Sequence, residues 1–514
     1  MLLDELVATV GRVASTRSRL AKVDALAELL SALAPAEIVP AVGYLTAKPR
    51  QGRVGVGWRT LQGGMGDPAE APTLTVLDVD DALGRLAAAA GSGSAAERTS
   101  VLRDLGSRAT DREQDFIARV ILGELRSGAL EGVLADAIAR AADRPGDIVR
   151  RAAMLSGDLG ETARIALTGA PGDLEAVGLL VGRPVLPMLA GTAPSATAAI
   201  GQVGEASVEF KLDGARIQVH RSGDEVRVFT RNLADITHRV PEVVEVVRGF
   251  PARELILDGE TLALDEGGAP RPFQETMSRF GAEAAREVVL HPWFFDVLHV
   301  DGRDLIDEPL AARLAELERV AGVHRIPGRV TADAEVAERV ARDALSAGHE
   351  GIVVKGVEAP YAAGRRGASW IKVKPVLTFD LVVLAAEWGS GRRTGWLSNL
   401  HLGARDPQGE FGEPGGFVMV GKTFKGLTDD LLRFQTERFP EIETRRTAHA
   451  VFVEPITVVE IAIDGVQRSS RYPGGIALRF ARVKGYRDDK GPGEADTIQS
   501  LRALLRGADE GGAT

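Results

Sequence analysis

The chain of 514 residues contains no cysteine. This absence excludes disulfides, thiol nucleophiles, iron–sulfur clusters and zinc sites with cysteine ligands. The eight histidines show no spacing typical of metal ligands, so we interpret them as structural or surface residues.

Long apolar runs are also missing, and none approaches the roughly 20 residues needed to cross a bilayer. The first residues, MLLDELVATVGRVAST, carry acids early and lack a basic region followed by an apolar block. We therefore expect a cytoplasmic protein without a secretory signal. The abundance of Ala, Gly and Arg suggests a GC-rich genome, and hence a bacterium.

An excess of positive charge is missing too, because 62 Lys and Arg stand against 72 Asp and Glu, for a net charge of −10. At face value this counts against a nucleic-acid partner. The charge is uneven, however: residues 479–490 hold five basic and two acidic side chains, and residues 362–374 hold four basic and no acidic ones. These local clusters of positive charge are therefore compatible with phosphate binding.

The length predicts about three domains. Residues 1–185 read as helical, with apolar residues three and four apart in 116–126 and 133–142. Residues 186–380 alternate strand-like and helical runs, which predicts an α/β or α+β domain. Residues 381–514 are rich in short strands, which suits a small β-barrel followed by a short tail of Gly and acids.

The first chemical candidate is Lys211, which ends an apolar strand in the run FKLDGAR and is followed by Arg216. A buried amine beside a turn can be a covalent nucleophile if its surroundings lower its pKa. Asp-Gly is also the strongest hairpin signal, and each such pair taken alone predicts an ordinary hairpin. The chain has four of them, at 213–214, 258–259, 301–302 and 464–465.

A second candidate is the run GFVMVGKT at Gly416–Thr423, which fits the phosphate-loop pattern G-x-x-x-x-G-K-[ST] and would make the protein an ATPase using Lys422. Asp464 could then serve as a magnesium ligand. The four residues between the glycines are strand-formers, whereas a phosphate loop needs flexible backbone and a following helix. We interpret this run as a β-strand.

Three further elements follow Lys211, namely LILDGE ending in Glu260, EGIVVK starting at Glu350, and WIKVKP with Lys372 and Lys374 two residues apart, hence on one face of a strand. Each alone reads as ordinary strand ends and edge charges. Together they supply two carboxylates for a hard divalent ion and several cations for a polyphosphate.

The order of these motifs resembles the covalent nucleotidyltransferase superfamily, specifically the ATP-dependent DNA ligases, over nearly the whole chain. The resemblance implies that Lys211 becomes adenylated, that Arg216 contacts the sugar and the nick, and that Glu209 reads the adenine amino group. It also implies that Phe295 stacks on adenine and that Arg231 contacts nick phosphate.

The remaining site residues implied by the resemblance fall into three groups. Glu260 and Glu350 correspond to the metal and ribose carboxylates. The residues expected to hold the phosphates of ATP or AMP are Lys372, Lys374 and Arg365. Those expected to bind DNA or orient pyrophosphate are Arg479, Arg482, Arg487 and Lys490.

The resemblance implies a helical DNA-binding domain (1–185), a nucleotidyltransferase (adenylation) domain (186–380) and an oligonucleotide-binding (OB-fold) barrel (381–514). The expected activity is the sealing of nicks in duplex DNA during replication, repair or recombination, by a monomer using ATP and Mg²⁺, with Mn²⁺ as the alternative ion. An RNA ligase or capping-type transferase remains the alternative. The helical N-terminal region favours DNA, and the absence of a Cys-rich zinc module disfavours the NAD-dependent ligases.

Overall fold

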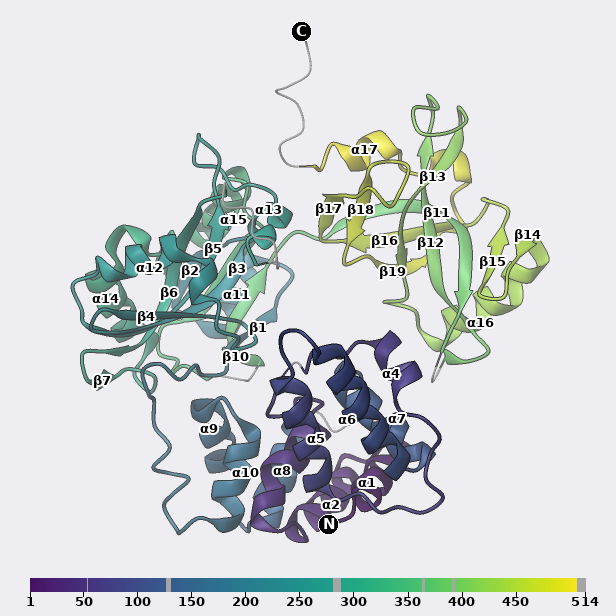
Figure 1. Cartoon of the computed structure of the whole chain (residues 1–514). Helices are drawn as coiled ribbons and strands as arrows, with labels where there is room; N and C mark the ends of the chain where they lie inside the picture. Colours follow the sequence, from purple (N-terminus) through teal and green to yellow (C-terminus); the bar gives the residue numbers. More distant parts are fainter. Residues whose placement is uncertain (53, 126–130, 281–287, 363–365, 391–392, 506–514) are drawn as a thin grey trace.

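The computed structural model describes residues 1–52, 54–125, 131–280, 288–362, 366–390 and 393–505. They form three lobes, with the helical N-terminal lobe at the bottom of Figure 1 and the other two above it. Within these ranges no helix is both long and apolar enough to cross a membrane.

The first lobe is a bundle of helices around one apolar core that contains Leu6, Leu26, Leu83 and Ile138. Two of its helices begin with a threonine whose hydroxyl accepts a hydrogen bond from the main chain three residues later, which satisfies an otherwise unpaired N–H. The helices are α1 (Leu3–Ser15), α2 (Arg19–Ser31), α3 (Ile38–Leu45), α4 (Trp58–Gly64), α5 (Val76–Ala88), α6 (Ser94–Arg108), α7 (Asp111–Leu122), α8 (Glu131–Ala141), α9 (Gly146–Ser156) and α10 (Leu159–Thr168).

The second lobe contains two five-stranded sheets. One has the order β1-β10-β9-β2-β8, with α11 and α15 packed against it; the other has the order β4-β3-β5-β6-β7, with α12 and α14 packed against it. The elements are β1 (Leu189–Thr192), α11 (Ala196–Val203), β2 (Ala206–Lys211), β3 (Ala215–Ser222), β4 (Glu225–Thr230), α12 (Pro241–Arg248), β5 (Glu254–Ala263), α13 (Phe273–Ser278), β6 (Leu290–Val300), β7 (Arg303–Asp304), α14 (Leu310–Ala321), β8 (Gly328–Thr331), α15 (Ala334–Ser346), β9 (Gly351–Gly356) and β10 (Arg366–Val373).

The third lobe is a strand-rich half barrel built around the long strand β11, which pairs with β12, β15 and β16. Its core includes Leu400, Phe439 and Ile461. The elements are β11 (Leu377–Trp388), β12 (Leu397–Asp406), β13 (Gly416–Thr423), α16 (Asp429–Arg438), β14 (Glu443–Arg446), β15 (Ala450–Val453), β16 (Val458–Ile463), β17 (Gly465–Arg468), β18 (Ile476–Arg479), β19 (Arg482–Tyr486) and α17 (Ile498–Arg502).

Two features mark the junctions between the lobes. Strand β11 begins at Leu377, so the sheet of the third lobe starts inside the segment assigned above to the second. At the other junction, Met154 and Leu155 at the end of α9 share an apolar cluster with residues of the second lobe. Arg151 also donates two hydrogen bonds to Asp307, at 2.7 and 2.6 Å, across this junction.

Only one of the four Asp-Gly pairs forms a simple hairpin, the turn at 301–302 between β6 and β7. The pair at 258–259 lies inside β5, so the hairpin reading is wrong there. The pairs at 213–214 and 464–465 each link strands that do not pair with each other. Of the tryptophans, Trp58 is 60% exposed, whereas Trp370 is buried.

Candidate active site

Lys211 is the last residue of β2, where the chain leaves one sheet and enters the other. The turn that follows is tight: a Cβ at Gly214 would lie 2.5 Å from the Thr261 carbonyl oxygen and 2.9 Å from Cγ of Glu260. Glycine therefore lets this turn approach β5 closely, and so brings the end of β2 to Glu260.

The register of the first sheet places the candidate residues in rows on one face. The central strand β9 pairs Lys355 with Ser207 and Trp370, and Val353 with Glu209 and Lys372, while Gly351 pairs with Lys211. Alternate residues of a strand share a face. The other face carries apolar residues such as Val208 and Ile352, which pack with the helices α11 and α15. The polar face is thus the one available for chemistry, as the spacing of Lys372 and Lys374 suggested.

The Lys211 amine is surrounded by carboxylates and forms an ion pair with Glu350. Burial disfavours its charge, but Glu350, Glu260 and Asp213 outweigh that effect and raise the pKa of Lys211 above its usual value. In this state the candidate nucleophile is therefore an ammonium ion.

Glu260 is half-buried on β5, and this burial raises its pKa to about 7, although Lys211 and Arg216 pull in the opposite direction. Among the described residues no three His, Asp or Glu side chains gather as a metal site. Glu260 and Glu350 both interact with Lys211, and Mg²⁺ is commonly held by only one or two carboxylates together with substrate phosphates. The donor set therefore fits a magnesium ion brought in with a nucleotide.

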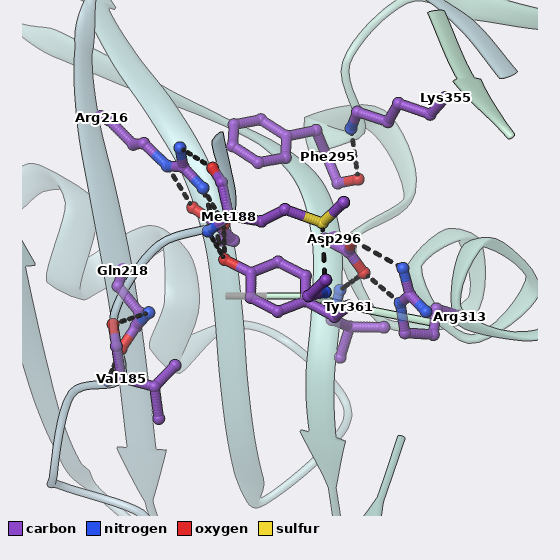
Figure 2. Close-up of polar contacts among 12 residues, drawn as sticks. Val185, Met188, Arg216, Gln218, Phe295, Asp296, Arg313, Lys355 and Tyr361 are labelled. Carbon is purple, nitrogen blue, oxygen red and sulfur yellow. Dashed lines mark hydrogen bonds and ion pairs between the residues drawn. The ribbon is translucent and has the colours of Figure 1, made fainter. Parts of the chain in front are cut away.

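Arg216 lies deep in a network formed by three segments of the second lobe (Figure 2). Its guanidinium donates to both oxygens of Asp258, at 3.0 and 2.6 Å, and to the Met188 carbonyl oxygen at 2.7 Å. The Tyr361 hydroxyl donates to Asp258 at 2.6 Å and accepts from the Met188 N–H at 3.0 Å. Burial, together with the Asp258 carboxylate, raises the pKa of Tyr361 well above its usual value, so its phenol stays protonated.

The connection from the helical lobe runs along β3 and is held by alternate side chains of that strand. Gln218 exchanges two hydrogen bonds with the main chain of Val185, at 2.8 and 3.2 Å (Figure 2). Nδ1 of His220 accepts from the Gly182 N–H at 3.0 Å. Burial lowers the pKa of His220 to about 3, so the ring stays neutral and able to accept. The connection is thereby fixed beside the site.

Glu209 lies further along the polar face, next to the buried side chain of Lys355, and Phe295 on β6 of the other sheet contacts this lysine. The Lys355 Nζ lies 2.5 Å from Oε2 of Glu209 and donates to the Phe295 carbonyl oxygen at 3.1 Å. It also lies 4.3 Å from the centre of the Phe295 ring. Phe295 is only 9% exposed, so a base would have to stack on the small part of its ring that remains open.

The half barrel reaches this site through two ion pairs. Arg479 donates to both oxygens of Asp213, at 2.7 and 3.2 Å, and Lys374 donates to Asp464 at 2.6 Å. Arg482 binds the other oxygen of Asp464 at 3.1 Å. A cavity of about 190 Å³ between the two lobes is bordered by Asp213, Lys374, Asp464 and Arg479, and Glu350 also lines it.

The other predicted residues are more scattered. Arg231 is exposed after β4 and lines a small hollow together with Arg216. Arg487 and Lys490 both bind Asp380 on β11, away from Lys211. Arg365 lies outside the described residues.

The run GFVMVGKT forms strand β13, paired with β12 along its length, so the phosphate-loop alternative is wrong. The Lys422 Nζ forms an ion pair with Glu387, which also accepts hydrogen bonds from His401 and Asn399. Despite partial burial, these donors lower the pKa of Glu387 to about 2. Lys422 therefore belongs to a local surface cluster of the half barrel.

Sequence reasoning missed several residues that hold the site together. Asp258 and Lys355 were visible as parts of the strand runs LILDGE and EGIVVK, Asp258 also as part of an Asp-Gly pair, and Tyr361 carried no signal in the sequence. Asp464 was noticed as part of another Asp-Gly pair and as a possible metal ligand of the rejected phosphate loop. A cation ending an otherwise apolar strand, as Lys355 does, is the one signal that could have been followed further.

A lysine that takes up a nucleotide needs cations for the phosphates and a base-binding surface on the same side of a sheet. The polar face of the first sheet carries a lysine at a strand end with further cations and a carboxylate beside it, which is the arrangement expected of a covalent nucleotidyltransferase.

Comparison with known proteins narrows the class. Three family models match in order: "DNA ligase N terminus" over residues 59–139, "ATP dependent DNA ligase domain" over 187–374 and "ATP dependent DNA ligase C terminal region" over 393–490. A "Probable DNA ligase" of Pseudarthrobacter chlorophenolicus is 73% identical over 506 residues, covering 98% of this chain and all of the relative. One of Rhodococcus jostii is 59% identical, covering 99% of this chain and all of the relative.

The solved structure "Pmar-Lig_PreS3" shares the fold, with a TM-score of 0.63 at 18% identity, covering 94% of this chain and 99% of that one. The chain belongs to the ATP-dependent DNA ligase family. Its members seal nicks in DNA through a lysyl-AMP intermediate, and repair and replication are their typical roles.

Proposed function

We propose that Lys211 carries the adenylate in this ligase and that the polar face of the first sheet holds ATP. The observation that supports this assignment best is the set of rows on that face. Four side chains lie on this face: Lys211, Glu209, Lys372 and Lys355. The proposed nucleophile, a lysine for binding phosphate and the proposed contacts to the base are therefore on one surface.

In the first step the Lys211 amine forms a bond to the α-phosphorus of ATP, and the bond to the oxygen of the β-phosphate breaks. Pyrophosphate leaves with that oxygen, and the amine gives up its proton. Lys372 and Lys374 offset the charge that develops on the phosphates. Because the amine is an ammonium in the free enzyme, it must first release one proton to water to free its lone pair, and forming the N–P bond releases a second proton to water.

Glu260 and Glu350 would hold the divalent ion that accompanies ATP. When bound, such an ion supplies positive charge next to the α-phosphate and competes with Lys211 for the two carboxylates. The residues themselves keep the lysine in place: the Glu350 N–H donates to the Lys211 carbonyl oxygen at 3.0 Å and fixes the two strand ends to each other.

In the later steps AMP passes to the 5′-phosphate at a nick in duplex DNA, and the neighbouring 3′-hydroxyl then displaces AMP. Arg216 and Arg231 are the proposed contacts to the nick. The ion pairs of Arg479 and Lys374 hold the half barrel over the site. These ion pairs must break, and the half barrel must move away, for DNA to reach Lys211. The protein acts as a monomer in this scheme.

ATP labelled at the α-phosphate tests the assignment. Wild-type protein should form a covalent adduct that Lys211→Ala abolishes. Lys422→Ala is the matched control, because Lys422 is the lysine of the sequence pattern that the fold rejects, and it should label normally. No adduct in wild type, or an adduct lost only in Lys422→Ala, would overturn the proposal. Parallel reactions with nicked RNA and with GTP separate DNA ligation from the RNA ligase and capping-type alternatives.

A further inference from the structure

The side chain of Lys355 is 2% exposed, which is unusual for an ammonium group. It sits between two aromatic rings, 4.3 Å from the centre of Phe295 and 4.4 Å from the centre of Trp370. Burying a charge without a partner is costly, so such a group is kept where its charge has a use. Its only carboxylate partner among the described residues is Glu209, which is 1% exposed.

Glu209 is held from two sides. Its Oε1 accepts a hydrogen bond from the Ser207 hydroxyl at 2.8 Å. Its Oε2 lies 2.5 Å from the Lys355 ammonium, but off the line of a well-directed hydrogen bond, so this buried oxygen still has acceptor capacity. A Cβ at Gly328 would lie 2.9 Å from Cγ of Glu209, so the neighbouring strand closes the back of the pair.

The place of this pair on the polar face gives it a role. On this face the pair of Lys211 and Gly351 is followed by the pair that contains Glu209, and then by the pair that contains Lys355. Lys355 also contacts Phe295. If Lys211 attacks the α-phosphate of ATP, as proposed above, the base extends away from Lys211 along these rows. An ionised carboxylate can only accept hydrogen bonds, so it suits the exocyclic amino group of adenine and repels the O6 oxygen of guanine.

We propose that Lys355 is the positioning residue for nucleotide selection: its buried ammonium holds the Glu209 carboxylate in place as the acceptor for the 6-amino group of adenine. Lys355 itself acts through Glu209, with the carbonyl of Phe295 and the two rings holding the ammonium in place. Without Lys355, the buried carboxylate of Glu209 would lose the cation that holds it and turn away, and the amino group of adenine would lose its acceptor.

The inference rests on the proposed function, and its test separates the two. Lysine adenylation is measured with ATP, with the analogue that carries hydrogen in place of the 6-amino group, and with GTP. Wild type should prefer ATP to the analogue by roughly ten- to a hundredfold in kcat/KM, the range for a hydrogen bond to a charged group. Lys355→Met should lower kcat/KM for ATP by a similar factor and leave the analogue nearly unchanged, so that the preference approaches one.

Two variants sharpen the result. Lys355→Arg keeps the charge and should restore part of the preference. Arg329→Met is the matched control. Arg329 is exposed on β8, the strand next to β2 in the same sheet. It pairs with Val208, whose side chain lies on the opposite face of the sheet from Glu209. It removes one positive charge from the same sheet and should leave the preference intact.

An equal loss with ATP and with the analogue in Lys355→Met would overturn the inference, because it would show a general structural role. So would a wild-type enzyme that uses ATP and the analogue equally well. If wild type forms no lysyl adduct with any nucleotide, the proposed function fails instead.

Discussion

Replacing Glu260 by glutamine should make the nucleotide-free protein more stable at neutral and alkaline pH, even though it removes a proposed active-site group. The reason is the burial of Glu260, which raises its pKa from 4.5 to about 7. The folded protein therefore binds this proton more tightly than the unfolded chain does. The resulting stabilisation is fully present below about pH 4.5 and is lost as the pH rises through about 7.

The size of the effect follows from the same two values. At about 1.4 kcal/mol per pH unit, the ionisation of Glu260 in the folded state costs about 3 kcal/mol by pH 8. A glutamine at this position does not titrate. The difference in free energy of unfolding between Glu260→Gln and wild type should thus grow by about 3 kcal/mol between pH 4.5 and pH 8. A domain of this size shifts its melting temperature by roughly 2–4 °C per kcal/mol, so the difference is measurable.

Thermal unfolding of both proteins at several pH values is the assay, with Glu358→Gln as the control. Glu358 is exposed on the same domain, and its replacement should not change the pH dependence. Adenylation by Glu260→Gln should be lost at every pH, which is the usual conflict between stability and activity at a catalytic site. A stability difference that is the same at pH 5 and pH 8, or that shrinks as the pH rises, would refute the reasoning.

Three other substitutions test separate parts of the structure. Gly351→Ala should destabilise the protein by at least about 2 kcal/mol in urea denaturation, because its φ is +140° and a Cβ would lie 2.3 Å from a main-chain oxygen; unchanged stability would contradict this geometry. Arg313→Met should cost about 3–5 kcal/mol in the same assay, since it leaves the fully buried Asp296 without its partner, and a cost under 1 kcal/mol would argue against an ionised pair. Asp213→Asn should slow lysine adenylation and speed tryptic cleavage between the second and third lobes, because it removes the negative charge and one of the two oxygens that accept from Arg479; cleavage at the wild-type rate would show that this pair does not hold the lobes together.

The sequence predicted the order of the three lobes and most of the strands around the site. The reason is that strand runs such as EGIVVK carry their periodicity locally: alternate residues share a face whatever the partner strand is. The same rule placed Lys372 and Lys374 together and identified GFVMVGKT as a strand despite its resemblance to a phosphate loop.

Turn chemistry was a weaker guide. Four Asp-Gly pairs look alike in the sequence, yet one lies inside β5 and two connect strands that do not pair with each other. Whether a turn closes a hairpin depends on which strands pair, and that is decided by packing across the domain.

By itself, the sequence singled out Lys211 as the candidate nucleophile, predicted the face on which Glu209 and the lysines lie, and indicated the family of the chain. Only the tertiary structure decided the partners: that Arg216 is held by Asp258 and Met188, that Asp213 reaches Arg479 on another lobe, and that Lys355 is buried against Glu209. Local spacing fixes a residue's face, whereas ion pairs and buried charges depend on register and chain path between segments far apart in sequence. Those contacts exist only once the sheets and lobes have packed.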